Sequence, residues 1–148
     1  MNRWLMKSEP HVYSIDDLKR DRTTGWSGVR NYQARNFMRA MAVGDPVLFY
    51  HSNAEPSGLA GIAEVCRAAY PDPTQFDRKS EYYELRATRE KPVWFQVDLR
   101  FARKLPRLLA LGELRARKEL ARMALFTRAR LSVQPVAEAE WKAIVSPP

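Results

Sequence analysis

The sequence predicts a single α+β domain over residues 1–148, in which short strands form a barrel-like sheet and short helices flank it. Segments typical of strands are interspersed with short helical segments, without the regular strand–helix–strand repeat of a doubly wound sheet. The chain has 148 residues, of which 45% are hydrophobic. This length suits one domain with its own core, and no linker-like stretch divides it.

The predicted strands are apolar segments bounded by turn residues. In residues 93–103, apolar side chains occupy alternate positions from Val93 to Phe101, as in a half-buried strand. Pro10 favours an extended backbone at Glu9 and so ends the first strand. The predicted strands cover residues 3–7, 47–51, 61–67, 93–103 and 131–136.

The predicted helices begin at residues that can cap them. Ser14 followed by Asp17 resembles a capping box. Asn31 can cap a second helix, which Gly44 and Pro46 stop. The predicted helices start near residue 14 and cover residues 31–42, 111–123 and 137–145. Turn-forming composition predicts loops at residues 53–58, 71–80 and 89–92.

Composition argues against a membrane protein, a metalloprotein and a nucleotide-cofactor enzyme. No apolar run approaches the ~20 residues that cross a bilayer, and the first residues do not resemble a secretory signal. One cysteine and two histidines argue against a structural zinc site and exclude an internal disulfide, which favours a cytoplasmic location. The glycines form neither a dinucleotide-binding nor a P-loop pattern, so we expect no cofactor and no metal.

The net charge of +8 comes from residues 100–130. This segment contains ten Lys or Arg and two acidic residues, whereas the rest of the chain contains fifteen of each. Such a segment is typical of a surface that binds a polyanion, but also of a solvated helix face that keeps a small protein soluble. Across the whole chain, the candidate phosphate contacts are Arg30, Arg35, Arg115, Lys118 and Arg122.

Residues 26–37 combine aromatic rings, a glycine turn, two arginines and two asparagines at a predicted loop-to-helix junction. The Trp26 indole can stack on a planar base, and the Asn31 amide can read a base edge. Arg30 lies at the helix start, where free N–H groups also favour anions. Arg35 has a structural alternative, which is to pair with a carboxylate. The segment contains no obvious nucleophile, which favours binding over catalysis.

Two further polar clusters follow predicted strands. Lys7, Ser8 and Glu9 supply a point charge, a hydroxyl and an acceptor for an exocyclic amine, although a strand end with a surface ion pair would use the same residues. A lone histidine in the second cluster is more often structural than a general base, and no partnered nucleophile is identifiable. The second cluster consists of His51, Ser52 and Asn53.

Five motifs in chain order together resemble the EVE domain family, and they span nearly the whole sequence. They are WLMKSEP at residues 4–10, WSGVRNYQARN at 26–36, YHSN at 50–53, WFQVD at 94–98 and LSVQPV at 131–136. The arginine-rich composition of residues 100–130 departs from the family pattern, which leaves open whether that segment contacts nucleic acid.

This resemblance implies a PUA-like pseudo-β-barrel of mixed strands flanked by short helices, related to the YTH readers of methylated adenine in RNA. It also implies a pocket for a modified base of DNA or RNA. The three implied walls of that pocket are Lys7, Ser8 and Glu9; Trp26, Gly28, Val29, Arg30 and Asn31; and His51, Ser52 and Asn53.

The resulting prediction is a nucleic-acid-binding module that takes one modified base into an aromatic pocket. The base would stack on Trp26, its edge would be read by Ser8 and Asn31, and arginines would hold the flanking phosphates. Two alternatives stay open. One is a small hydrolase of modified nucleosides that uses Lys7 and Glu9. The other is a protein-interaction domain that uses the basic segment.

Overall fold

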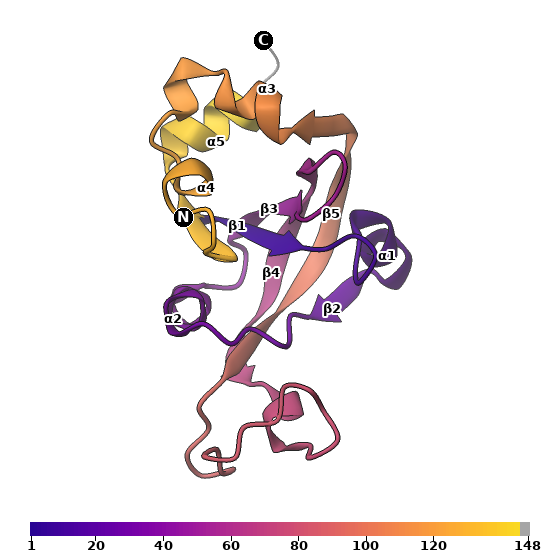
Figure 1. Cartoon of the computed structure of the whole chain (residues 1–148), viewed down its shortest axis with the longest axis vertical. Coiled ribbons are helices and arrows are strands. Elements are labelled where there is room, and N and C mark those ends of the chain that lie inside the picture. The colour runs from indigo at the N-terminus through magenta and orange to yellow at the C-terminus, as the bar shows by residue number, and fades with distance from the viewer. Residues whose placement is uncertain (146–148) are drawn as a thin grey trace.

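The computed structural model describes residues 1–145, and its framework is one six-stranded sheet (Figure 1). The strand order is β2-β5-β4-β3-β1-β6, in which β1 and β3 are parallel and all other neighbours are antiparallel. The strands are β1 (Arg3–Ser8), β2 (Thr23–Gly25), β3 (Pro46–His51), β4 (Gly58–Pro71), β5 (Phe95–Ala110) and β6 (Val133–Val136). The edge strands β2 and β6 do not pair with each other, so the barrel is not closed. The predicted α+β class is confirmed.

The central strands β4 and β5 are longer than the sequence predicts. Their pairing shifts register at several points, and such bulges bend and twist a strand. β5 begins at Phe95 instead of Val93, because the backbone N–H groups of Val93 and Trp94 donate to the Gln75 side chain. β2 was not predicted, since a three-residue edge strand carries no periodic pattern.

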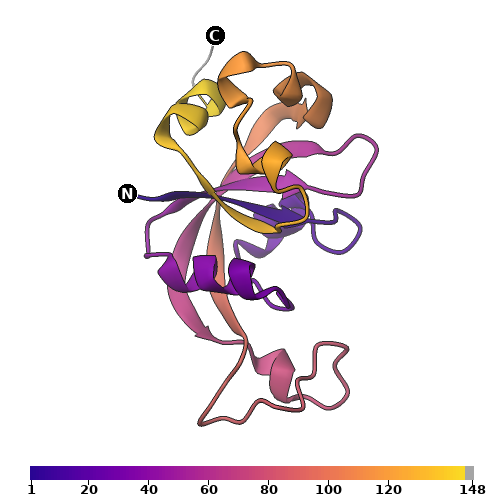
Figure 2. The same cartoon turned by 60° about the vertical axis from the view of Figure 1, so that its left-hand side comes forward.

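Short helices flank the sheet, and most gather at one end of the molecule (Figure 2). The predicted caps are confirmed: Ser14 and Asp17 form a reciprocal capping box, and Asn31 Oδ1 accepts a 2.9 Å hydrogen bond from the Ala34 N–H. The α-helices are α1 (Ile15–Asp21), α2 (Tyr32–Ala40), α3 (Leu111–Arg115), α4 (Ala124–Thr127) and α5 (Glu138–Val145). The 3₁₀-helices are η1 (Pro73–Phe76) and η2 (Lys118–Leu120).

The prediction of one continuous helix over residues 111–123 is wrong. The chain forms α3, turns at Arg117 with an extended backbone, and forms η2 before α4 begins. On one helix, Leu114 would point to a different face from Leu120 and Met123. The breaks allow all three side chains to be fully buried in the same core.

Apolar side chains on the two faces of the sheet form two cores. Trp4 and Phe49 face the core that α1 and α2 cover, whereas their neighbours Leu5 and Leu48 face the core that α3, η2 and α5 cover. Successive residues of a strand point to opposite faces, so β1 and β3 contribute to both cores. This double burial fixes the end of β1, which positions the site described below.

Residues 72–94, here called the 72–94 loop, connect β4 to β5. They project from one end of the molecule, and α3, η2, α4 and α5, here called the helical cluster, lie at the opposite end (Figures 1 and 2). The buried side chain of Gln75 joins the two ends of this loop. Gln75 Nε2 donates to the carbonyls of Asp72 (2.8 Å) and Trp94 (2.7 Å), and Oε1 accepts from the N–H groups of Val93 and Trp94 (both 2.9 Å). The loop is therefore anchored to the framework at both ends.

Candidate functional site

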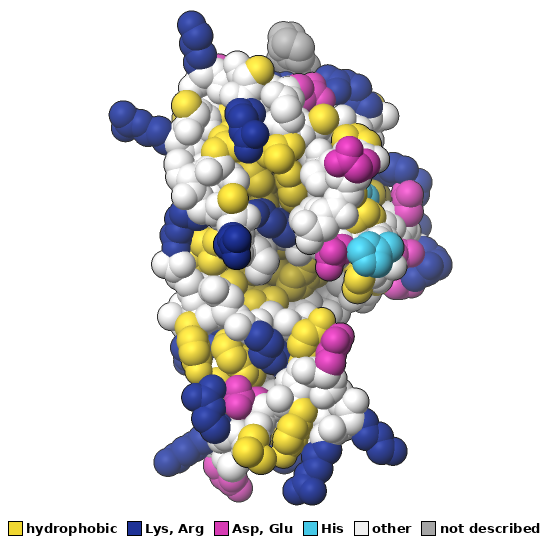
Figure 3. All heavy atoms as spheres, viewed as in Figure 1, with side chains coloured by type: hydrophobic (Ala, Val, Ile, Leu, Met, Phe, Trp, Pro, Cys, Tyr) yellow, Lys and Arg dark blue, Asp and Glu magenta, His cyan; other side chains and the backbone are white. Residues whose placement is uncertain are grey.

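Two adjoining hollows open where β1, β2 and the 72–94 loop meet. The first hollow has a volume of about 440 Å³. On this face, apolar side chains lie at the floor of a depression, and Lys and Arg side chains stand beside it (Figure 3). The first hollow is lined by Lys7, Ser8, Val12, Tyr13, residues 24–30, Tyr82 and Ser132.

The second hollow has a volume of about 580 Å³ and shares four lining residues with the first. The residues that line both hollows are Lys7, Val12, Tyr82 and Ser132. The residues that line only the second hollow are Glu9, Ser52, Asn53, Ala129 and Arg130. A larger groove of about 1020 Å³ lies between β5 and α5 and contains none of the predicted site residues.

Lys7 and Ser8 are held at the end of β1 by parallel pairing with Tyr50 and His51 of β3. The Lys7 ammonium donates a 2.6 Å hydrogen bond to the carbonyl of Ala129, and burial lowers the pKa of this amine. Ser8 Oγ donates to the Tyr13 carbonyl at 2.7 Å. The Ser8 oxygen keeps lone pairs, and the ammonium keeps donors, for a guest in the hollow.

Trp26 lines the first hollow but belongs mostly to the core. Its backbone N–H donates to the Val97 carbonyl at 2.8 Å, which continues the β2–β5 pairing. Only 9% of Trp26 is exposed, and its ring packs edge-to-face against Phe49 with the centroids 5.5 Å apart. The sequence places Trp26 beside mobile or exposed glycine and serine, but the structure holds the indole rigidly with a small part facing the hollow.

Arg30 was expected to contact phosphate, and the structure corrects this expectation. Its guanidinium donates twice to the Tyr82 carbonyl (2.7 and 3.2 Å) and once to the Val29 carbonyl (3.0 Å). The other two hydrogen bonds go to Thr74 Oγ1 (3.0 Å) and to the Asp72 carboxylate (3.1 Å). All five N–H donors of a guanidinium are thereby occupied, so Arg30 fastens the 72–94 loop.

The Asp72 carboxylate, which accepts from Arg30, is completely buried. Burial alone would raise the pKa of Asp72, but hydrogen bonds from Thr74, Gly28 and Arg30 together bring it below its usual value. The Gly28 N–H also donates to Asp72 at 2.8 Å, so this carboxylate binds both Gly28 and Arg30 to the first residue of the 72–94 loop. This ion pair sets the position of the 72–94 loop relative to residues 26–30.

Tyr82 is the residue through which the 72–94 loop reaches the hollows. Its ring packs on Gly28, whose φ is +82° and where a Cβ atom would lie 2.9 Å from the ring. The Arg30 guanidinium lies 5.3 Å from the centroids of both Tyr82 and Trp94. Trp94 itself is buried and stacks on Tyr32, with the ring centroids 4.8 Å apart.

Three other residues of the predicted walls have different positions. Asn31 caps α2 and does not line either hollow, so its amide is not placed to read a base there. His51 Nε2 accepts from the Ile15 N–H at 3.1 Å, and burial lowers the pKa of His51, which fits a structural role. Glu9 accepts from the Asn53 side chain at 3.2 Å in the second hollow.

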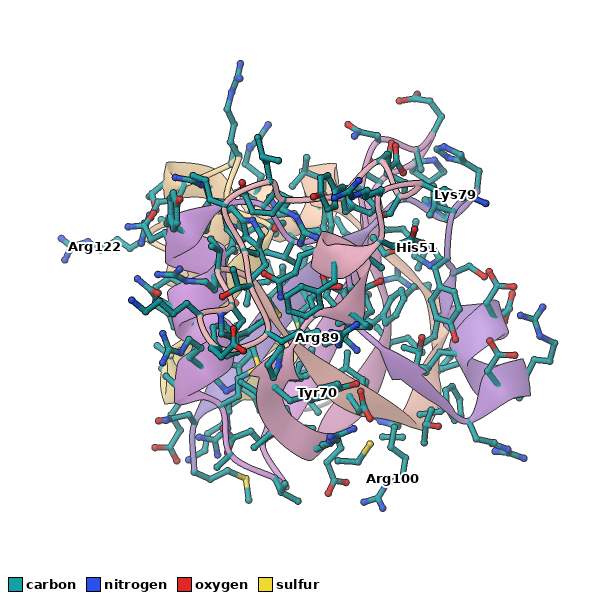
Figure 4. The ribbon with its side chains drawn as sticks, turned by 90° about the horizontal axis from the view of Figure 1, so that it is seen from below. His51, Tyr70, Lys79, Arg89, Arg100 and Arg122 are labelled. Atoms are coloured by element: carbon teal, nitrogen blue, oxygen red, sulfur yellow. The ribbon has the colours of Figure 1, made fainter. Side chains whose placement is uncertain are left out.

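The remaining candidate phosphate contacts lie outside the two hollows. Arg35 donates to Asn36 Oδ1 and to the Val93 carbonyl, so it connects α2 to the last residues of the 72–94 loop. Arg115, Lys118 and Arg122 belong to the helical cluster at the far end from the 72–94 loop. Figure 4 shows Arg122 projecting outward from the edge of the molecule.

Sequence reasoning missed Tyr82, Arg130 and Ser132. Ser132 lies in the LSVQPV motif, and Arg130 directly precedes that motif, so proximity to a motif was the available signal. Tyr82 lies in a segment without periodicity, and its only signal is an aromatic side chain in a polar loop. Within residues 1–145, no group of three His, Cys, Asp or Glu is arranged to hold a metal, and no helix could cross a bilayer.

Comparison with known proteins gives consistent matches over the whole chain. Residues 2–146 match the EVE domain model. Thymocyte nuclear protein 1 of Homo sapiens is 42% identical over 164 residues, which cover 98% of this chain and 73% of that protein. A solved protein from Leishmania major is 56% identical, with a TM-score of 0.94 over 97% of this chain and 92% of that chain. Human THYN1, solved in complex with DNA containing 5-methylcytosine, is 42% identical, with a TM-score of 0.93 over 97% and 95% of the two chains. The resemblance predicted from the motifs is confirmed, and this chain belongs to the EVE domain family.

Proposed function

We propose that this chain binds a modified base of a nucleic acid in the first hollow, with 5-methylcytosine in DNA as the leading ligand. The observation that carries the proposal is the likeness to human THYN1, a protein of the same fold that was solved with 5-methylcytosine-containing DNA. The volume of the hollow, about 440 Å³, lies within the range of small-molecule sites, roughly 300–1,000 Å³.

The lining of the first hollow suits a planar, polar guest. Trp26 and Tyr82 supply aromatic surface, on which a base can stack. Lys7 can donate to the ring nitrogen and carbonyl of a cytosine, and the Ser8 oxygen can accept from its exocyclic amine. The hollow therefore offers both a hydrogen-bond donor and an acceptor to one base edge.

A base that enters the hollow must leave any duplex that contains it. Flipping costs a few kcal/mol and costs least when the base is already unpaired. We therefore expect single-stranded or mismatched sites to bind more tightly than a fully paired site. RNA is the second ligand class of this proposal, since the hollow contacts the base and does not itself select the sugar.

Fluorescence polarisation with matched oligonucleotides tests the proposal. The oligonucleotides carry one 5-methylcytosine, another methylated base, or plain cytosine, in DNA and in RNA, at low salt. Burying one methyl group contributes about 0.8 kcal/mol, so the methylated oligonucleotide should bind about fourfold more tightly. Equal affinity for methylated and plain oligonucleotides, or no binding at low salt, would overturn the proposal.

One observation favours the hydrolase alternative, namely the lowered pKa of Lys7, which suits an amine that acts as a nucleophile or base. Against it, the Lys7 amine donates to the Ala129 carbonyl, and Glu9 accepts from Asn53. Incubation with 5-methyl-deoxycytidine, followed by mass spectrometry, separates the two functions. A product that disappears in the Lys7→Arg variant would establish an enzyme.

A further inference from the structure

A polynucleotide that crosses the two hollows needs positive charge beside them. Arg30 and Arg35 use their guanidinium groups within the protein. Besides Lys7, the basic side chain that lines the second hollow is Arg130, from the segment that connects α4 to β6. We call residues 128–132 the α4–β6 segment.

The α4–β6 segment borders three hollows in sequence. Ser132 lines the first, and Ser132, Arg130 and Ala129 line the second. A third hollow of about 320 Å³ is lined by the same segment, from Arg128 to Leu131, together with two polar residues of the α2 start. The segment therefore marks one continuous path, which leads away from the first hollow past Arg130 and then Arg128.

The backbone of the α4–β6 segment is fixed before any ligand binds. The Lys7 backbone N–H donates to the Ser132 carbonyl (2.9 Å), and the Lys7 ammonium donates to the Ala129 carbonyl (2.6 Å). The Arg128 carbonyl accepts from the Leu131 N–H (3.0 Å), and Leu131 is buried in the core. A fixed backbone loses little entropy on binding, so arginines that project from it are pre-organised.

The charge along this path is mainly positive. Arg128 and Arg130 form no ion pair within residues 1–145, and Arg130 is exposed. Lys7 adds a third cation between the first and second hollows. Among residues 1–145, Glu9 is the only carboxylate that lines any of the three hollows. Since phosphate contacts position a nucleic acid and base contacts specify it, such a path complements a hollow that reads a base.

We propose that the α4–β6 segment carries the sugar–phosphate backbone on one side of the bound base, with Arg130 contacting the nearer phosphate and Arg128 the next. This inference rests on the proposed function, and it identifies the ligand as a base within a polynucleotide strand. It also gives the strand a direction. Nucleotides on one side of the modified base lie along the α4–β6 segment, and those on the other side do not.

The test measures the affinity of a methylated single-stranded oligonucleotide at several salt concentrations. Arg130→Ala and Arg128→Ala should each weaken binding equally for methylated and plain oligonucleotides, and each should lower the salt slope by about 0.7, the value per phosphate for a single strand. Arg130→Lys should keep the slope. Arg122→Ala removes an arginine of the same basic sequence that lies outside the hollows, and it should leave the slope unchanged.

A second measurement tests the direction of the strand. Short oligonucleotides carry the modified base at the 5′ end or at the 3′ end, so that their phosphates lie on one side only. One of the two should show the full effect of Arg130→Ala, and the other should show none. Thermal unfolding midpoints verify that each variant is folded.

The outcomes distinguish the two proposals. The phosphate path is wrong, and the base site is kept, under the following outcome. Arg130→Ala and Arg128→Ala both keep the wild-type affinity and salt slope, whereas a Trp26 variant loses binding. A lower slope in Arg122→Ala alone would place the phosphates on the helical cluster and overturn the path as well. If variants of Trp26 and Arg130 both bind as the wild type does, the proposed function itself is wrong.

Discussion

Replacing Arg30 with alanine should release the 72–94 loop from the wall of the first hollow. Four of the five hydrogen bonds of its guanidinium connect Arg30 to Asp72, Thr74 and the Tyr82 carbonyl. Without Arg30, the backbone carbonyl of Tyr82 loses its donor, and the Tyr82 ring is no longer held beside the hollows. We therefore expect a less stable protein, a more mobile loop and weaker ligand binding in one variant.

The size of the effect follows from the burial of the ion pair. Removing one partner of a buried pair costs about 3–5 kcal/mol, because the other charge stays buried without compensation. Here the Arg30 side chain is 21% exposed, and the Asp72 carboxylate keeps hydrogen bonds from the Gly28 N–H and from Thr74. We therefore expect a loss of about 2–3 kcal/mol, or a fall in Tm of about 6–10 °C for a chain of this length.

Circular dichroism gives the Tm, and limited trypsin digestion reports the loop separately. The loop contains basic cleavage sites between residues 78 and 91, so its release should accelerate cleavage there before global unfolding. Arg86→Ala is the matched control, since Arg86 lies in the same loop with a side chain that is 66% exposed and should matter little. An unchanged Tm and cleavage rate in Arg30→Ala would refute the reasoning.

Acid titration of the same variant gives an independent check. The pKa of Asp72 is below its usual value, so its stabilising contribution is complete above the ordinary value of 3.8 and is lost as the pH falls below it. Arg30 is one cause of this lowered pKa. The Tm of Arg30→Ala should therefore decline less steeply than that of the wild type below about pH 4.

Three further predictions concern the walls of the hollows. Trp26→Phe should reduce affinity for the methylated oligonucleotide by up to ~1–3 kcal/mol if stacking on the indole contributes, as measured by fluorescence polarisation. Gly28→Ala should displace the Tyr82 ring and cost about 1–3 kcal/mol, because alanine is strained at φ +82° and its Cβ meets the ring; a wild-type Tm would contradict this. His51→Gln should flatten the dependence of Tm on pH. In the wild type, burial lowers the pKa of His51, so stability falls as the pH drops below about 6.5 and the ring becomes protonated. The protonated ring also no longer accepts from the Ile15 N–H.

The sequence was informative wherever a local pattern determined structure. The capping residues Ser14 and Asn31 start α1 and α2 as predicted, because N-caps depend on a few adjacent backbone groups. The alternating residues of β5 also gave a strand. The interrupted helices after β5 could not be predicted, since they depend on a core completed by distant residues such as Leu5 and Ile144.

The candidate site was predicted in part for the same reason. Lys7, Ser8 and Trp26 line one hollow because they lie at strand ends that the sheet brings together. The role of Arg30 was not predictable, because its partners Asp72 and Tyr82 are more than forty residues away. The sequence did not show which basic residues of the 100–130 segment lie beside the hollows, since these residues share a composition but occupy different parts of the surface.

The hydrogen bonds of Gln75 at the two ends of the 72–94 loop affect how such a domain can change its ligand. This side chain satisfies four backbone groups at the two ends of the 72–94 loop, so it holds the two ends together whatever residues lie between them. Loop length adds little entropic cost once the ends are joined. Side chains of residues 77–91 that make no contact outside the loop can therefore change while the framework persists, provided that the Tyr82 carbonyl still reaches Arg30. New ligand preferences can therefore evolve or be engineered through substitutions in residues 77–91.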